Sequence, residues 1–323
     1  MKDSYGREIN YIRISLTDRC NLRCVYCMPH GTQLVPREEI LRRQEIVRVV
    51  RAAAGLGIRF VKVTGGEPLV RRCCDGLTKD LKEIPGIEKV TLTTNGILLR
   101  EHLDTLKKAG IDAINISLDT TDPERYMKLT GGGDVSKVID AIHASVEAGI
   151  RTKINAVVLG EDWEDVLLFA RALPVDVRFI EMMPIGFGSG YSHSDNREVF
   201  CRIRERYPEI RRDPSPHGNG PAVYYRSPGW KGSVGFISAI HGKFCDSCNR
   251  LRLTSMGYLK TCLSYEDGTD LRAILRNEEI PEEERDGRLR DAIADAIARK
   301  PKAHCFDHPE SITEKHLMAS IGG

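Results

Sequence analysis

Strand-like segments alternate with helix-like segments through the first part of this 323-residue chain. The expected strands are rich in isoleucine and valine and are bounded by turn residues; they cover residues 9–17, 58–64, 89–94, 112–118, 151–158 and 176–183. Helical patterns lie between them, at residues 37–55, 76–84, 98–109, 135–148 and 162–172. Because parallel strands need a helical crossover between them, this alternation predicts parallel βα units.

The number of these units predicts an α/β fold of the partial TIM barrel type. A closed barrel needs eight strands, and this stretch has about six; a doubly wound open sheet is the structural alternative. After residue 184 the chain becomes rich in Gly, Pro and Ser and shows no long periodic helix until residues 281–299. We therefore expect two regions: the partial barrel at residues 1–184, and a smaller α+β region at residues 185–323.

Composition limits the classes of function. Hydrophobic residues make up 41% and the formal net charge is +2, which indicates a sizeable core and predicts neither a nucleic-acid partner nor an acidic surface partner. We see no signal-peptide pattern and no apolar stretch long enough for a membrane, so we expect a cytoplasmic protein. Ten cysteines in that compartment favour metal or redox chemistry over disulfides.

Chemically distinctive loops follow the expected strands. They are the first cysteine loop, TGGEP (64–68), TTNG (93–96), SLD (117–119) and EMMP (181–184). In either architecture ligands collect at the carboxyl ends of the strands. These loops are therefore expected to line one site.

The first cysteine loop holds Cys20, Cys24 and Cys27 in the spacing C-x3-C-x2-C. Three thiolates can hold three irons of a cubane cluster and leave the fourth iron open for a non-protein ligand. Zinc is the alternative, with His30 as a candidate fourth ligand. The remaining cysteines are interpreted as ordinary thiols: Cys73, Cys74, Cys201 and Cys305.

CNLRCVYC after one strand and TGGEP after the next resemble the radical S-adenosylmethionine (SAM) enzymes. The resemblance implies a [4Fe-4S] cluster whose open iron binds SAM and whose electron cleaves it to a 5′-deoxyadenosyl radical. It also implies SAM contacts from Tyr26, Gly66, Ser117 and Met183, which lie in or after the same loops.

A second triplet, Cys245, Cys248 and Cys262, has the spacing C-x2-C-x13-C and could hold another cluster with an open iron. Arg250 and Arg252 follow directly. In an extended segment two such arginines project to one side, where they suit a phosphate-bearing ligand. A solvated surface strand is the alternative interpretation.

Residues 244–263 (FCDSCNRLRLTSMGYLKTCL) and the terminal Gly322–Gly323 narrow the resemblance to the GTP 3′,8-cyclases of molybdenum cofactor biosynthesis, over almost the whole chain. It implies that the 5′-deoxyadenosyl radical takes the ribose 3′ hydrogen of GTP. The C3′ radical then attacks guanine C8, giving (8S)-3′,8-cyclo-7,8-dihydroguanosine 5′-triphosphate. The second cluster would bind the guanine.

The same resemblance assigns roles to residues of this chain. The implied GTP contacts are Arg13, Lys62, Thr93, Lys153, Arg178, Arg250, Leu251 and Arg252. Arg13, Arg250, Arg252, Gly322 and Gly323 are implied to be needed for catalysis, with the tail entering the site. Lys62 departs from the arginine that many family members carry, so the two-pronged phosphate contact of a guanidinium is lost there.

The resemblance further implies partners. They are an electron donor such as flavodoxin or ferredoxin and, downstream, cyclic pyranopterin monophosphate synthase; a homodimer is compatible with it. Two other functions remain open from sequence: a radical SAM enzyme that modifies a peptide, and a non-catalytic metal-binding or electron-carrying protein. The SAM-type loops argue against a carrier, and the paired arginines argue for a nucleotide substrate.

Overall fold

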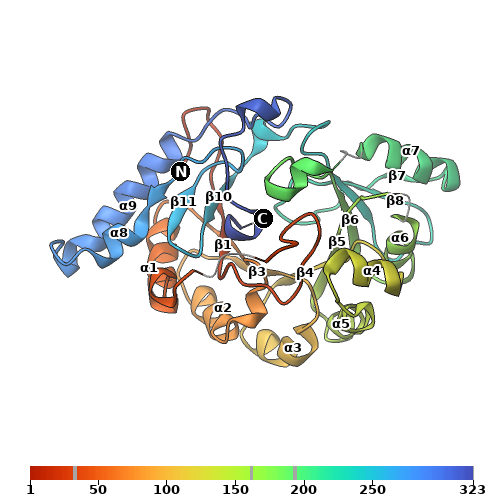
Figure 1. Cartoon of the computed structure of the whole chain (residues 1–323), viewed down its shortest axis with the longest axis horizontal. Coiled ribbons are helices and arrows are strands. Elements are labelled where there is room, and N and C mark those ends of the chain that lie inside the picture. Colours follow the sequence, from red (N-terminus) through yellow and green to blue (C-terminus); the bar gives the residue numbers. More distant parts are fainter. Residues whose placement is uncertain (32–34, 161–162, 192–194, 323) are drawn as a thin grey trace.

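A computed structural model describes residues 1–31, 35–160, 163–191 and 195–322 (Figure 1). These residues form one mixed sheet of 12 strands in the order β12-β11-β10-β1-β2-β3-β4-β5-β6-β9-β8-β7. The first six strands of the chain run parallel and side by side. Their bounds are Tyr11–Ser15 (β1), Phe60–Thr64 (β2), Lys89–Thr94 (β3), Ala113–Ser117 (β4), Arg151–Val157 (β5) and Asp176–Ile180 (β6). Every strand expected from sequence is confirmed.

Helices cover the outer face of this curved sheet, and Figure 1 shows them as an arc below the strands. They are α1 (Arg43–Ala54), α2 (Cys74–Lys82), α3 (Leu99–Lys108), α4 (Pro123–Thr130), α5 (Val135–Glu147) and α6 (Trp163–Ala172). One buried apolar cluster joins the strands to these helices, for example Ile14, Val63 and Leu92 against Val50 and Leu77. With helices on one face and a cavity on the other, the sheet is a partial barrel rather than a doubly wound sheet.

The C-terminal region extends the same sheet at both edges. Strand β10 (Arg250–Leu253) pairs in parallel with β1, and β9 (Val234–Ile237) pairs in parallel with β6. Beyond them lie antiparallel strands: β11 (Tyr258–Lys260), β12 (Thr269–Asp270), β8 (Val223–Arg226) and β7 (Arg211–Arg212). On their outer sides, β9 pairs with β8 and β10 pairs with β11. Since β9 and β10 do not pair with each other, the barrel formed by the described residues stays open.

Three helices were not expected from sequence, among them the short α8 (Leu271–Arg276). Helix α4 begins at Pro123 behind an Asp122 cap, and α7 (Asn196–Arg206) begins behind an Asp195 cap whose side chain accepts from the Arg197 amide. The expectation of no long helix in the Gly- and Pro-rich region was therefore wrong for these 11 residues. Helix α1 also starts at Arg43 rather than residue 37.

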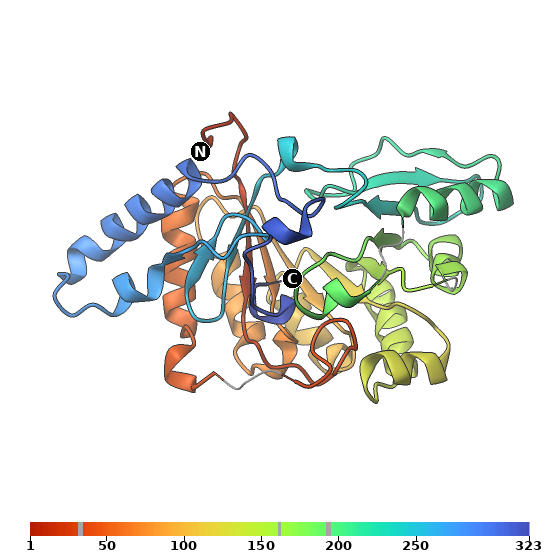
Figure 2. The ribbon, with the colours of Figure 1, turned by 45° about the horizontal axis from the view of Figure 1, so that its top comes forward.

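The other described elements complete the C-terminal region. Helix α9 (Glu282–Ala298) matches the expected helix near 281–299, and α8 (Leu271–Arg276) precedes it; in Figure 2 both lie beside α1. Short 3-10 helices occupy Arg37–Glu39, Pro68–Val70, Gly186–Gly190, Cys245–Ser247, Pro309–Ser311 and Met318–Ser320. Among the described residues no helix is both long and apolar enough to cross a membrane.

Candidate active site

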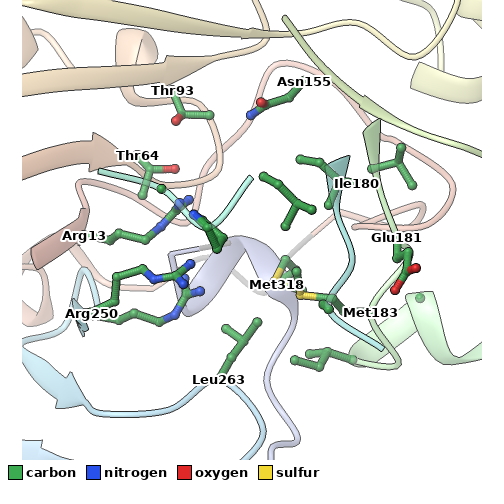
Figure 3. A pocket seen from close by; sticks show the side chains of 18 of the residues that line it. Arg13, Thr64, Thr93, Asn155, Ile180, Glu181, Met183, Arg250, Leu263 and Met318 are labelled. Carbon is green, nitrogen blue, oxygen red and sulfur yellow. The ribbon is translucent and has the colours of Figure 1, made fainter. Parts of the chain in front are cut away.

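A cavity of about 370 Å³ opens at the carboxyl ends of the parallel strands and is lined by both cysteine triplets. We call it the central chamber. Figure 3 shows residues from many parts of the chain converging on it, including Arg13, Thr93, Glu181, Arg250 and Met318. The triplets, more than two hundred residues apart in sequence, therefore face one space.

The first triplet lies in the loop after β1. A tight turn shapes this loop, because the amides of Cys27 and Met28 both donate to the Cys24 carbonyl at 3.0 Å. Asn95 from the TTNG loop places its Nδ2 3.7 Å from Cys20 Sγ. Burial, reinforced by Cys20, raises the pKa of Cys27 to about 11, so metal binding there would have to displace a proton.

The second triplet has a more cationic setting. Burial alone would raise the pKa of Cys248, but Arg250 and Lys300 outweigh it and lower this pKa to about 7. The backbone amide of His304 also donates to Cys245 Sγ at 3.4 Å. Cationic neighbours favour the thiolate, which is the metal-binding form of cysteine.

The number and grouping of the thiol ligands bear on the choice between a cluster and a single zinc ion. A tetrahedral zinc site holds its sulfurs about 3.8 Å apart, given Zn–S bonds of about 2.3 Å. Among the described residues, one group of three or more possible metal ligands has all its ligand atoms within 4.8 Å of one another. It consists of Glu181, Asp195 and His241. Neither cysteine triplet meets that limit, with or without His30. The described side chains therefore form no four-ligand zinc site at either triplet, and three thiolates without a fourth side-chain ligand suit a cubane cluster with one open iron.

Gly66 and Glu67 of TGGEP hold the loops of the SAM region together. A Cβ on Gly66 would lie 2.4 Å from the Arg19 carbonyl oxygen, so only glycine lets this loop pack against the cysteine loop. The buried carboxylate of Glu67 accepts from the amides of Leu69 and Asn95 and from the Thr94 hydroxyl. Burial raises the pKa of Glu67 to about 7.

Tyr26, Ser117 and Met183 all line the central chamber, as does Gly66. The Tyr26 hydroxyl donates to Asp119 Oδ2 at 2.6 Å, and the Val157 amide donates to Asp119 Oδ1 at 2.9 Å. Asp119 thus ties the Tyr26 hydroxyl to the carboxyl ends of β4 and β5. The SLD stretch had marked this position by its place after a strand, without revealing its partner.

Strand register brings the expected cations together. Arg252 on β10 pairs with Arg13 on β1, which pairs with Lys62 on β2. All three side chains reach the central chamber. The alternate residues Leu251 and Ile12 are fully buried in the outer core. The Leu251 side chain thus lies away from the chamber, so only its backbone could serve an incoming GTP.

The C-terminal segment enters the chamber. The Gly322 carbonyl accepts from Arg13 Nε at 3.0 Å and from Arg252 Nη1 at 2.5 Å, and Met318 and Ala319 line the cavity. Gly322 has a φ of +75°, a conformation that glycine adopts at no steric cost. Gly323 lies outside the described residues. The tail thus reaches the arginines to which sequence resemblance had linked it.

Three of the expected GTP contacts lie deeper in the barrel. Lys62 and Arg178 line both the central chamber and a second cavity below it, and Lys153 lines only the second. Burial, together with Arg178 and Arg13, lowers the pKa of Lys62 well below its ordinary value. Thr93 lies on the chamber wall, where its hydroxyl accepts from Asn115 Nδ2 at 3.4 Å.

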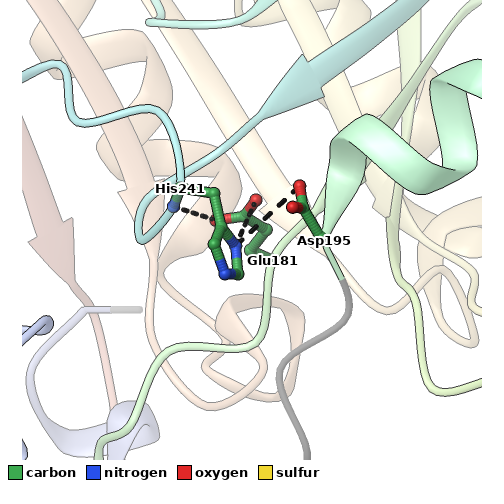
Figure 4. A group of neighbouring side chains, drawn as sticks. All are labelled: Glu181, Asp195 and His241. Atoms are coloured by element: carbon green, nitrogen blue, oxygen red, sulfur yellow. Dashed lines mark hydrogen bonds and ion pairs between the residues drawn. The ribbon is translucent and has the colours of Figure 1, made fainter.

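Glu181, Asp195 and His241 form a further cluster beside the chamber (Figure 4). Their oxygens are already engaged: Glu181 accepts from the amides of Ile240 and His241, and Asp195 pairs with Arg197 at 2.6 Å. These contacts tie the end of β6 to the segment after β9. Glu181 thereby positions the neighbouring Met183 segment, and sequence gave no sign of its partners.

A partial βα barrel with a cysteine triplet after its first strand is the architecture of the radical SAM class. Residues 14–173 match the model of the Radical SAM superfamily, and residues 175–306 match Molybdenum Cofactor Synthesis C. Crystal structures of Streptococcus suis SuiB have a similar fold. One gives a TM-score of 0.61 at 17% identity and covers 96% of this chain and 76% of that one.

Sequence relatives are more specific. The chain is 42% identical to proteins named GTP 3′,8-cyclase from Clostridium perfringens (strain SM101 / Type A) and Pelotomaculum thermopropionicum, over 100% of each chain. A protein of the same name from Moorella thermoacetica is also 42% identical over 100% of both chains. This chain belongs to the GTP 3′,8-cyclase family of the radical SAM superfamily.

Proposed function

We propose that this chain catalyses the GTP 3′,8-cyclase reaction, the first step of molybdenum cofactor biosynthesis. The observation that carries the proposal is the single chamber that joins two cysteine triplets with a row of cations between them. The full-length relatives named for this activity support it. The net reaction converts GTP into its 3′,8-cyclised isomer.

Each triplet would hold one [4Fe-4S] cluster: Cys20, Cys24 and Cys27 the first, and Cys245, Cys248 and Cys262 the second. The first cluster, with SAM, would supply the one-electron chemistry that activates the ribose C3′ position. The electron would come from a donor protein such as flavodoxin or ferredoxin, and the product would pass to cyclic pyranopterin monophosphate synthase.

The protein residues bind and orient the reactants. Tyr26, held by Asp119, and Gly66, Ser117 and Met183 form the wall on which SAM would lie. Arg13, Lys62, Arg178, Arg250 and Arg252 face the chamber as cations in a protein of formal net charge +2. Anions are favoured in a recess lined by cations, and a triphosphate brings several negative charges that guanidinium groups bind well.

The tail contributes a neutral partner for two of these cations. The Gly322 carbonyl bridges Arg13 and Arg252, so it fixes both guanidinium groups relative to one another. A guanidinium held in this way loses less rotamer freedom when a phosphate or ribose oxygen arrives. We propose that the tail prepares the arginines for substrate.

Two cysteine variants test the function. We expect Cys24→Ala to abolish SAM cleavage, because its triplet would no longer hold the electron-transferring cluster. We expect Cys248→Ala to keep uncoupled SAM cleavage but to lose cyclisation, because only the second triplet is disrupted.

The measurement is 5′-deoxyadenosine and cyclised nucleotide after anaerobic reconstitution with SAM, dithionite and GTP. Cysteine Cys201, exposed on α7, offers a matched Cys201→Ala control with full activity. Full cyclisation by Cys248→Ala would reject a substrate-binding second cluster. Cleavage of SAM with GTP left unchanged by the wild type would reject the cyclase assignment.

A further inference from the structure

A second cavity, of about 690 Å³, lies at the amino-terminal ends of the parallel strands. We call it the basal cavity. Its wall includes the first residues of three strands, Tyr11, Phe60 and Lys89, and its floor is the segment 212–220. Lys62 and Arg178 line this cavity and the central chamber alike, so the two spaces adjoin through these side chains.

The basal cavity is strongly cationic. Its basic lining residues are Lys62, Lys89, Arg151, Lys153, Arg178 and Arg212. Three of them are more than nine-tenths buried: Lys62 is 7% exposed, Lys153 6% and Arg178 9%. Lys62 has no hydrogen bond or ion pair to any described residue, and Arg178 Nε is buried without a hydrogen-bond partner in the same set. Buried cations in this state favour an incoming anion.

Within the described residues, Lys153 is the one of these three buried cations with a carboxylate partner, and that partner is Asp176. Asp176 Oδ2 lies 2.9 Å from Lys153 Nζ, and the Tyr224 hydroxyl lies 2.9 Å from the same nitrogen. The His217 ring stacks on Tyr224 at 3.9 Å and contacts Asp176 at 3.0 Å. Asp176 is therefore held in place from two sides, with its charge directed at Lys153.

We infer that Asp176 stands in for a substrate phosphate: it neutralises Lys153 in the nucleotide-free enzyme, and the terminal phosphate of the nucleotide competes with it. This inference rests on the proposed function, because it takes GTP as the anion that enters. A triphosphate that passes Lys62 and Arg178 from the chamber reaches Lys153, whereas a monophosphate is too short to do so. Asp176 is thus a positioning residue, acting through Lys153, that sets how strongly affinity depends on phosphate number.

The test uses Asp176→Asn in the anaerobically reconstituted holoenzyme. Isothermal titration calorimetry would give dissociation constants for GTP, GDP, GMP and inorganic triphosphate. We expect GTP and inorganic triphosphate to bind about five- to tenfold more tightly to the variant, between the values of exposed and buried ion pairs. GMP should change by less than about twofold, because it does not reach Lys153.

Asp112→Asn is the matched control. Asp112 lines the basal cavity, whereas Asp176 lies behind Lys153 and outside the lining; the Asp112 carboxylate accepts from Lys82 at 2.8 Å and from the Val90 amide at 2.7 Å. The Asp112→Asn variant should leave the dissociation constants of GTP, GDP, GMP and inorganic triphosphate unchanged. Asp176→Ser provides a second variant if the asparagine disturbs the fold, and the gain should vanish when Lys153→Met is added.

Three outcomes would overturn the inference. Weaker or unchanged GTP binding by both Asp176 variants would mean that Asp176 holds Lys153 ready for substrate instead of competing with it. An equal gain for GMP would place the effect away from the terminal phosphates. A gain that survives Lys153→Met would remove Lys153 from the explanation. Failure of the proposed function would look different: no cyclised product and no preference for GTP over ATP, with the effect of Asp176 on inorganic triphosphate intact.

Discussion

The substitution Lys62→Met should change substrate binding and protein stability in opposite directions. Lys62 is 7% exposed, lies on β2 between the two cavities, and has no ion-pair or hydrogen-bond partner among the described residues. Methionine has a similar volume and no charge. We expect the variant to bind GTP more weakly and, without nucleotide, to be more stable than the wild type.

The expected gain follows from the cost of an uncompensated buried charge. Replacing even a buried ion pair by apolar groups of similar size is often neutral or stabilises proteins by about 1–4 kcal/mol, and we expect a gain of this size for a buried charge that has no partner. At ~2.1 cal/mol/K per residue, a chain of 323 residues has an unfolding entropy of about 0.7 kcal/mol/K. The gain therefore corresponds to a Tm increase of about 1.5–6 °C.

The pH dependence has a defined sign. Burial lowers the folded-state pKa of Lys62 below its ordinary value of 10.5. The folded state thus binds fewer protons than the unfolded state between these two pKa values, and stability rises with pH in that window. The advantage of Lys62→Met should be full below the folded-state pKa and should shrink as the pH approaches 10.5.

Thermal unfolding of the nucleotide-free protein measures the effect, with Lys260→Met as the matched control. Lys260 is 3% exposed but is paired with Glu314 at 2.6 Å. Its loss leaves the buried Glu314 carboxylate without its lysine, with only His316, of the described residues, still hydrogen-bonded to it, so we expect destabilisation of about 3–5 kcal/mol. A lower Tm for Lys62→Met, comparable with that of the control, would refute the view that Lys62 is an uncompensated charge.

Three further predictions follow from the site. The Gly66→Ala variant should lose about 1–3 kcal/mol of stability and bind less iron, because the added Cβ would lie 2.4 Å from the Arg19 carbonyl oxygen. Iron content and thermal unfolding measure these effects. The control variant Gly287→Ala, which adds its Cβ to open space, should show neither loss. Burial and Arg178 lower the pKa of Lys153 to about 8, so GTP affinity should fall as the pH rises past 8 in the wild type and not in Lys153→Met. Truncation after residue 321 removes the Gly322 bridge and should stop cyclisation while iron content stays unchanged; normal turnover would contradict a role for the tail.

The strands were predictable from sequence because each carries its own local signal. Runs of isoleucine and valine between turn residues marked β1 to β6, and their order placed the cysteine loop and TGGEP at one edge. Helix α7 was missed because it lies between Gly- and Pro-rich stretches and depends on its Asp195 cap. The parallel pairing of β9 and β10 with the barrel was also beyond local patterns, since register between distant segments is set by tertiary packing.

The division of the chain at residue 184 stays a prediction about domains. The single sheet runs across that point, since β9 continues directly from β6. The two family models meet between residues 173 and 175, about ten residues earlier, so β6 falls within the second model.

The sequence by itself determined which chemical groups this protein can use. Two cysteine triplets, the TGGEP loop and Arg250-Leu251-Arg252 are local patterns, and strand alternation alone places both arginines on one face. Only the tertiary structure decided that the triplets share one chamber, that Gly322 bridges Arg13 and Arg252, and that Lys153 pairs with Asp176. The physical reason is distance along the chain: Arg13 and Gly322 are 309 residues apart, and no local pattern encodes a contact of that separation.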